Sequence, residues 1–122
     1  MAAPSGRGSE RRYRLTGIGA FEALFREGRR REGERLQIVF MPARGVPGRT
    51  GFVIGKKALP RAVDRNRLRR MLRESLRRNR PALAPYDLIV RLKRGCPPAA
   101  FSEVRSEAER LLRTLPPASG KP

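Results

Sequence analysis

The sequence of 122 residues contains no histidine and only one cysteine, Cys96. Histidine is the commonest general base in enzymes and the commonest metal ligand, so catalytic or metal sites built on it are excluded. A single cysteine cannot form a disulfide within the chain, so nothing requires an oxidising compartment. These absences favour a cytoplasmic protein that does not use histidine chemistry.

Long apolar runs are also absent. No stretch approaches the roughly 18 apolar residues that span a membrane, and the first ten residues, MAAPSGRGSE, lack the apolar segment of a secretory signal. Neither end of the chain carries an amphipathic or lipidation signal. We therefore expect no membrane partner.

Acidic residues are scarce, with 11 Asp and Glu against 29 Lys and Arg, which gives a formal net charge of +18. Such a chain repels itself and favours a polyanionic partner, with nucleic acid the leading candidate. Only four of the basic residues are lysines, and arginine suits phosphate and base recognition. The base composition of the source genome would explain the arginine excess equally well.

The few acids bear on catalysis. A nuclease that works without RNA needs clustered carboxylates to hold metal ions, and no pair of acids in this sequence has an obvious convergent placement. We expect no metal or cofactor bound by the protein itself, and no intrinsic catalysis.

The length suits one domain with a single modest core. Residues 1–10 and 116–122 are small, polar and rich in proline or glycine, and are predicted to be disordered tails. The folded domain is predicted over residues 11–115.

The hydrophobic periodicity predicts six elements in the order α-β-β-α-β-α. Thr16 can cap the first helix and Gly28 can end it, and a basic loop follows at 29–31. The other predicted elements are strands at 36–41 and 50–54 forming a hairpin, a helix at 62–78, a strand at 86–93, and a last helix from about 101 to 115. The expected fold class is α+β, an α-β sandwich on a small sheet.

The helix at 62–78 concentrates positive charge. Residues 65–80 contain eight arginines and one acid, Glu74, whereas a solvated helix face usually mixes both signs. Leu68, Met71, Leu72 and Leu76 fall on one stripe, which would hold the helix to the core while most arginines lie on the other side. Arginines on successive turns repeat about every 5–6 Å, comparable to the phosphate spacing of a nucleic-acid strand. Asp64 suits the positive end of the helix and is a candidate cap.

Two segments then resemble a known family. KK at 56–57 with RNRLRRMLRE at 65–74, and YRL at 13–15 with AFEALFREGRR at 20–30, are similar to the signature segments of the bacterial ribonuclease P protein subunit. The predicted element order agrees, and the resemblance covers roughly residues 11–114. It implies a left-handed β-α-β crossover around the arginine helix, where sequence alone favours the right-handed form.

The resemblance also implies a function. This family joins a large catalytic RNA, and the complex removes the 5′ leader from precursor tRNA with Mg²⁺ that the RNA subunit uses. The implied partners are the RNA subunit and precursor tRNA, with no obligate protein partner. The residues implied to contact the RNA subunit are Arg65, Asn66, Arg67, Arg69, Arg70 and Arg73. The residues implied to bind the leader are Phe21, Phe25, Lys56 and Lys57.

The leader-binding residues also have ordinary structural interpretations. Two phenylalanines at this helical spacing are more often core than contact residues, and two lysines at a strand end are as often simply solvated. Gln37 and Val39 are further candidates for the leader groove. The chain departs from the family at Ala20, where an acidic residue is common, and near Val39, where an aromatic or hydroxyl residue is common. A ribosomal-protein-like or DNA-binding module also remains open, because charge alone does not exclude it.

Overall fold

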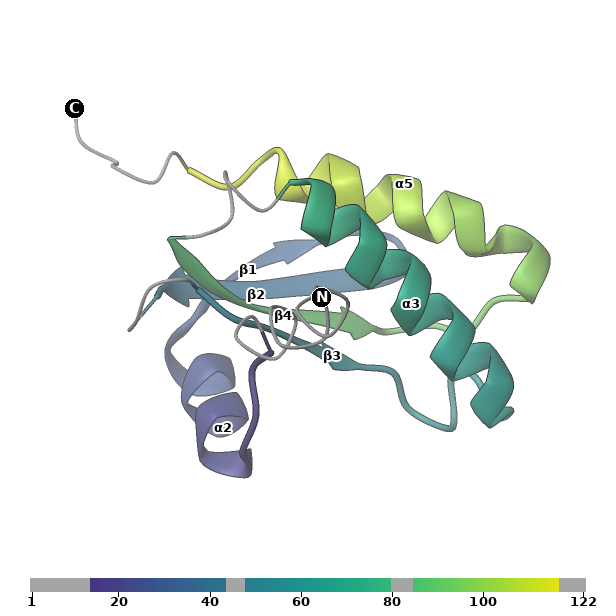
Figure 1. Ribbon diagram of the computed structural model, residues 1–122, viewed down its shortest axis with the longest axis horizontal. Coiled ribbons are helices and arrows are strands. Elements are labelled where there is room, and N and C mark those ends of the chain that lie inside the picture. Colours follow the sequence, from purple (N-terminus) through teal and green to yellow (C-terminus); the bar gives the residue numbers. More distant parts are fainter. Residues whose placement is uncertain (1–13, 44–47, 80–84, 117–122) are drawn as a thin grey trace, which may run out of the picture.

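A four-stranded sheet lies at the centre of the computed structural model, which describes residues 14–43, 48–79 and 85–116. The strands are β1 (Arg29–Glu32), β2 (Leu36–Pro42), β3 (Thr50–Val53) and β4 (Tyr86–Leu92), in the spatial order β1-β2-β4-β3. The helices are α2 (Ile18–Glu27), α3 (Ala62–Arg78) and α5 (Phe101–Leu112), with a short 3-10 turn, η1 (Pro98–Ala100), before α5. Helices α3 and α5 cover one face of the sheet and α2 covers part of the other (Figure 1). The predicted α+β sandwich is confirmed. The predicted tails lie outside the described residues, apart from Pro116.

The predicted hairpin between the second and third strands is wrong. Strand β4 lies between them, antiparallel to β2 with Ile38 opposite Val90, and parallel to β3 with Thr50 opposite Leu88. The reason lies in β4 itself, where residues 86–90 are all buried. A strand that is apolar on both sides is stable only in the middle of a sheet with both faces covered.

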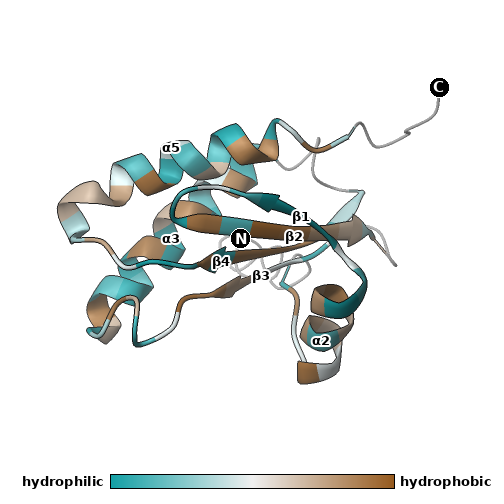
Figure 2. Cartoon of the chain, turned by 180° about the vertical axis from the view of Figure 1, so that it is seen from behind, coloured by the Kyte–Doolittle hydropathy of each residue, from teal (hydrophilic) through white to brown (hydrophobic). Residues whose placement is uncertain are grey.

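The predicted basic loop at 29–31 is also wrong, because these residues form the edge strand β1, with Arg31 opposite Ile38. Charged side chains are favourable on an edge strand, since they discourage pairing with other chains. The β1–β2 connection is held from α5, where the buried carboxylate of Glu107 accepts hydrogen bonds from the backbone N–H groups of Arg35 and Leu36, both at 2.9 Å. Figure 2 shows this contrast, with β1 hydrophilic beside the hydrophobic β2 and β4.

The unit β3-α3-β4 forms the left-handed crossover that the family resemblance implied. In Figure 1, β3 and β4 run in the same direction, β4 lies above β3, and α3 returns on the viewer's side of the sheet. This path turns left-handed, against the strong general preference for right-handed crossovers. It places α3 on the same face of the sheet as α5.

The ends of the helices test the capping predictions. Helix α3 has the predicted bounds, but Asp64 lies in its first turn, and Arg61 precedes it without a side-chain cap. Helix α2 begins after Gly17, not Thr16, because Gly17 takes a φ of 92°, a conformation that favours glycine. Gly28 ends α2 as predicted, and its N–H donates to the carbonyl of Leu24 at 2.8 Å.

The core has two parts, one on each side of the sheet. The larger part lies beneath α3 and α5, which contribute Leu68, Leu72 and Phe101 among others. The smaller part lies beneath α2 and consists of Leu15, Leu24, Val39 and Ile89. Because the face toward α2, the α2 face, is covered over only part of its length, the remainder is open for contacts.

Candidate nucleic-acid interface

The outer side of α3 carries two exposed arginines, Arg67 and Arg70. Neither side chain makes a hydrogen bond, ion pair or ring contact with another described residue. Leu68, Leu72 and Leu76 are buried on the opposite side and anchor the helix. The two guanidinium groups therefore face solvent from a rigid support.

Arg65 behaves differently from most of the arginines, which were predicted to lie on the side away from the leucines. It precedes Leu68 by three residues and Leu72 by seven, which places it on the leucine side of the helix. Its guanidinium group donates to the backbone carbonyls of Leu59 at 2.8 Å and Pro60 at 2.9 Å. Arg65 thus holds the turn that leads into α3.

The remaining predicted residues of α3 lie between these extremes. Asn66 is exposed, and its side-chain oxygen accepts a hydrogen bond from Arg69 at 2.8 Å. Arg73 is half-buried, with its guanidinium carbon 5.5 Å from the ring centre of Phe52 on β3. The cationic surface thus extends from the outer side of α3 down to the β3 edge of the sheet.

The two phenylalanines of α2 are both half-buried and pack against the smaller part of the core. The ring of Phe21 lies over Gly51 of β3, where an added Cβ atom would come within 2.4 Å of the ring. Phe25 follows one turn later on the same side of α2. Both rings therefore contribute to the core and also retain exposed surface on this side of the helix.

One row of paired residues crosses all four strands on the open part of the α2 face. Strand register places Glu32 beside Gln37, Gln37 beside Arg91, and Arg91 beside Val53. We call these four residues the open row. Gln37 was predicted to reach this surface and is half-buried here, whereas Val39 is fully buried beneath α2, so its predicted exposure is wrong.

Hydrogen bonds fix the polar side chains of the open row. Gln37 donates to Glu32 at 2.7 Å and accepts from Arg91 at 3.3 Å, and Lys93 donates to Glu32 at 2.9 Å. The hydrogen bond from Gln37, followed by that from Lys93, keeps the pKa of Glu32 below its ordinary value. The row is an ordered surface of donors and acceptors, and Arg91 was foreseeable from the alternation of β4.

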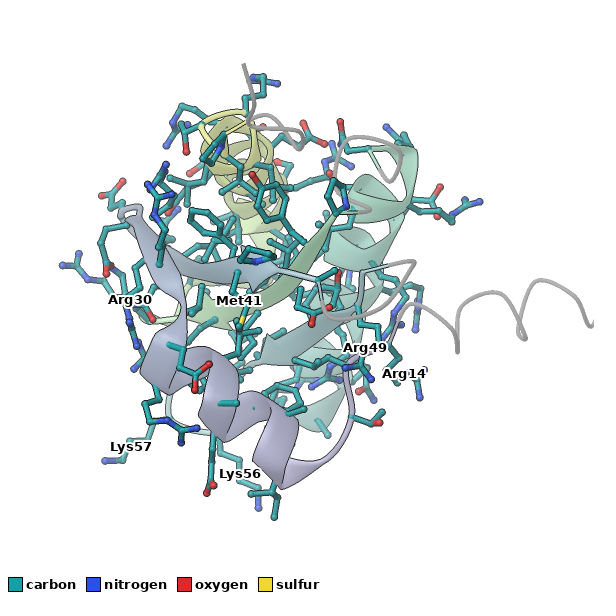
Figure 3. The ribbon with its side chains drawn as sticks, turned by 90° about the vertical axis from the view of Figure 1, so that its left-hand side faces the viewer. Arg14, Arg30, Met41, Arg49, Lys56 and Lys57 are labelled. Atoms are coloured by element: carbon teal, nitrogen blue, oxygen red, sulfur yellow. The ribbon has the colours of Figure 1, made fainter. Side chains whose placement is uncertain are left out.

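Lys56 and Lys57 do not end a strand as predicted. They lie in a turn that begins three residues after Val53, the last residue of β3, and both are exposed. Figure 3 shows their side chains on the same side of the sheet as α2. Arg14 belongs to the YRL segment at 13–15 but was not predicted as a site residue. It is exposed and pairs with Thr50 through an isolated parallel bridge that extends the β3 edge.

The described part of the chain offers no group of three or more Cys, Asp or Glu side chains that could hold a metal ion. None of its helices is long and apolar enough to cross a bilayer. The arrangement defines a small basic α+β protein with two adjoining polar surfaces, the outer side of α3 and the open part of the α2 face. Clustered exposed arginines and a high net charge are the features of nucleic-acid-binding proteins.

Comparisons with known proteins identify the family. The family model described as Ribonuclease P matches residues 10–116. The ribonuclease P protein component of Synechococcus sp. strain JA-2-3B'a(2-13) is 42% identical over 106 residues, which cover 83% of this chain and 80% of that protein. The chain belongs to the family of ribonuclease P protein components.

Solved structures agree with this assignment. The RNase P protein from Thermotoga maritima superposes with a TM-score of 0.72 at 28% identity, covering 84% of this chain and 99% of that one. A variant of the Staphylococcus aureus RNase P protein has a TM-score of 0.77 at 19% identity, covering 93% and 96%, and supports the fold alone.

Proposed function

We propose that this chain is the RNA-binding subunit of ribonuclease P, which joins a catalytic RNA and with it removes the 5′ leader from precursor tRNA. The observation that carries the proposal is a pair of exposed guanidinium groups, those of Arg67 and Arg70, which contact no other described residue. They lie on a helix anchored by buried leucines, in a member of this family. Arginine forks suit phosphate oxygens, and rigid placement lowers the entropic cost of each contact.

In this proposal the outer side of α3 binds the RNA subunit and supports its active fold. Arg67 and Arg70 contact phosphates directly, and Arg69 and Arg73 extend the contact along the β3 side of the helix. Arg65 acts by holding the start of α3 in place, since one of its terminal nitrogens, Nη1, donates to the carbonyls of Leu59 and Pro60. Asn66 contributes by orienting Arg69.

The open part of the α2 face is proposed to bind the single-stranded leader. Phe21 and Phe25 offer ring surface on which bases of any sequence can stack. Lys56 and Lys57 supply positive charge on the same side of the sheet, and the open row provides hydrogen-bonding groups between them. Leader binding of this kind tolerates many sequences, which is consistent with a substrate range that spans many tRNAs.

Catalysis is assigned to the RNA subunit and its Mg²⁺ ions, with the protein contributing binding and orientation. The test is reconstitution of the purified chain with RNA subunit transcribed from the same source, followed by cleavage of a 5′-labelled precursor tRNA. We expect cleavage at the mature 5′ end, with a lower Mg²⁺ requirement than the RNA alone shows. Cleavage by the protein without RNA would contradict the assignment, as would equal affinity for ribosomal RNA fragments, duplex DNA and the RNA subunit.

Leader binding at the lysine turn is tested separately, by comparing the affinities for precursor tRNA and mature tRNA. The full chain, assembled with the RNA subunit, should bind precursor tRNA more tightly than mature tRNA, and the joint change of Lys56 and Lys57 to Gln should reduce that difference. Joint substitution by Gln of Arg110 and Arg113, which are exposed on or just after α5, is the matched control. If the control reduces the difference as much, the leader does not bind at the lysine turn.

A further inference from the structure

A small cavity lies on the flank of α2 opposite the phenylalanines. Its volume is about 160 Å³, and it is lined by Leu15, Gly19, Ala20, Ala23, Leu24, Met41, Arg49 and Asp87. At 3.6 residues per turn, Ala20 and Ala23 lie on the side of α2 away from Phe21 and Phe25. The cavity is therefore separate from the open row and from the proposed leader contacts. Figure 3 looks toward this end of the sheet, where Met41 and Arg49 lie beside α2.

The cavity exists because the helix presents small side chains there. Gly19, Ala20 and Ala23 leave a gap between α2 and the end of β2, where larger residues would have filled it. A cavity of about 150 Å³ holds one benzene ring. This space therefore matches a single six-membered ring and is too small for a larger ligand to enter completely.

One residue in the cavity lining, Asp87, carries a nearly buried carboxylate. Asp87 is only 5% exposed, and its Oδ1 atom accepts a hydrogen bond from the backbone N–H of Arg49 at 2.9 Å. Its other oxygen has no partner among the described residues. Among the described residues, every fully buried side-chain oxygen has a hydrogen-bond partner. The second oxygen of Asp87 therefore retains some accessible surface, and that surface faces the cavity that Asp87 lines. A nearly buried acceptor of this kind favours a ligand that brings an N–H donor.

Arg49 supplies the complementary group. Arg49 also lines the cavity, and the guanidinium group of its half-buried side chain forms no ion pair with Asp87 or with any other described acid. The cavity thus combines one free acceptor, one free donor and apolar walls. A flat ring with an amino group on one edge and a carbonyl group on another satisfies both.

We propose that this cavity binds one unstacked cytosine base of the RNA partner, with the cytosine amino group donating to Asp87 and its carbonyl oxygen accepting from Arg49. Acceptance from the cytosine amino group is an established way for Asp to read this base. Uracil has the same size but presents a carbonyl oxygen where cytosine has the amino group, so the Asp87 carboxylate repels it. The inference relies on the proposed function only in taking RNA as the partner.

The test compares CMP with UMP, which match in phosphate, sugar and ring size. Each nucleotide is titrated into the ¹⁵N-labelled full chain while amide shifts are followed by NMR. We expect CMP to shift the amides of Gly19, Ala20, Ala23 and Met41, and to bind at least about fivefold more tightly than UMP. Equal binding of both nucleotides, with shifts confined to α3, would show phosphate binding alone and would overturn the proposal.

Two variants sharpen the test. Asp87→Asn keeps an oxygen for the Arg49 N–H but replaces the free acceptor with an amide donor, so the preference should move from CMP to UMP. Ala23→Leu should fill the cavity and abolish the shifts from CMP. Glu22→Gln removes the same charge from an exposed position of α2 and should leave the CMP to UMP ratio unchanged. Dispersed amide spectra confirm that each variant folds.

The outcome is separable from that of the proposed function. An active reconstituted holoenzyme whose protein shows no CMP preference would overturn this inference and leave the proposed function intact. A clear CMP preference together with an inactive reconstituted holoenzyme would overturn the proposed function and leave this inference intact. CMP binding that persists in Ala23→Leu would also overturn the inference, because the ring would then lie elsewhere.

Discussion

Joint substitution of Arg67 and Arg70 by Gln should weaken binding of the RNA subunit without unfolding the protein. Both side chains are exposed and make no contact with other described residues, so the free energy of unfolding should change by no more than about 0.5 kcal/mol. Gln has a similarly high helix propensity and removes the charge, and the matched control makes the same shortening of the side chain. The change therefore isolates the electrostatic contribution.

The magnitude follows from counterion release. Each phosphate neutralised contributes about 0.7–0.9 to the slope of log affinity against log salt, so losing two contacts should reduce that slope by about 1.4–1.8. Extrapolated from 1 M to 0.15 M salt, two such contacts correspond to a loss of affinity of about 15- to 30-fold, or about 1.6–2.0 kcal/mol. At 1 M salt the variant and the unaltered chain should bind almost equally.

The assay is fluorescence anisotropy of labelled RNA subunit across 0.1–1 M KCl, with thermal unfolding measured in parallel. The matched control changes Arg110 and Arg113 to Gln, because these exposed residues lie on or just after α5 and carry the same total charge. We expect the control to change affinity less than threefold. If both variants lose affinity equally, net charge and not the surface of α3 drives binding, and the reasoning fails.

Three further predictions follow from the packing and the one thiol. Arg65→Ala should lower the free energy of unfolding by about 1–3 kcal/mol in urea denaturation, because the carbonyls of Leu59 and Pro60 lose their donor; unchanged stability would mean that these bonds are replaced by water. Gly51→Ala should destabilise the fold by about 1–3 kcal/mol, since the new methyl group meets the ring of Phe21, and Thr50→Ser in the same strand is the mild comparison. Burial raises the pKa of Cys96, so less thiolate is present at pH 8.5 and iodoacetamide should react with it more slowly than with a free thiol; a rate equal to that of glutathione would contradict this.

Local hydrophobic periodicity was enough to predict the helices that bury only one side. The bounds of α3 follow from the spacing of Leu68, Leu72 and Leu76 between a proline before the helix and a proline after it. The end of α2 at Gly28 was predictable for a similar reason, because glycine tolerates the backbone that ends a helix. In these cases the residues that fix the element lie within the element.

Strand order could not be predicted in the same way. Sequence proximity suggested that β2 pairs with β3, but the doubly buried β4 lies between them. The arginines of β1 suggested a loop, because their strand pairing depends on contacts with β2 and on Glu107, which is about seventy residues away in the sequence. Such partners become visible only in three dimensions.

The site residues, too, could be predicted only where their position depends on local periodicity. Periodicity separated Arg67 and Arg70 from the leucines, but it did not show that Arg65 turns back to bind the carbonyls of the preceding turn. The family resemblance suggested that Val39 reaches the leader groove, whereas α2 covers it. Alternation identifies two faces of a strand but not which of them another element covers.

The position of β4 has a consequence for how the protein is made. Strand β4 is the last strand to be synthesised, yet β2 and β3 each pair with it. While the ribosome is still adding residues 48–85, the growing polypeptide can form only the β1–β2 hairpin, and β3 has no neighbouring strand to join. Until Tyr86–Leu92 has been synthesised and completes the sheet, the arginine-rich segment between β2 and β4 has no sheet to pack against, and we expect it to be open to early contacts with polyanions or chaperones.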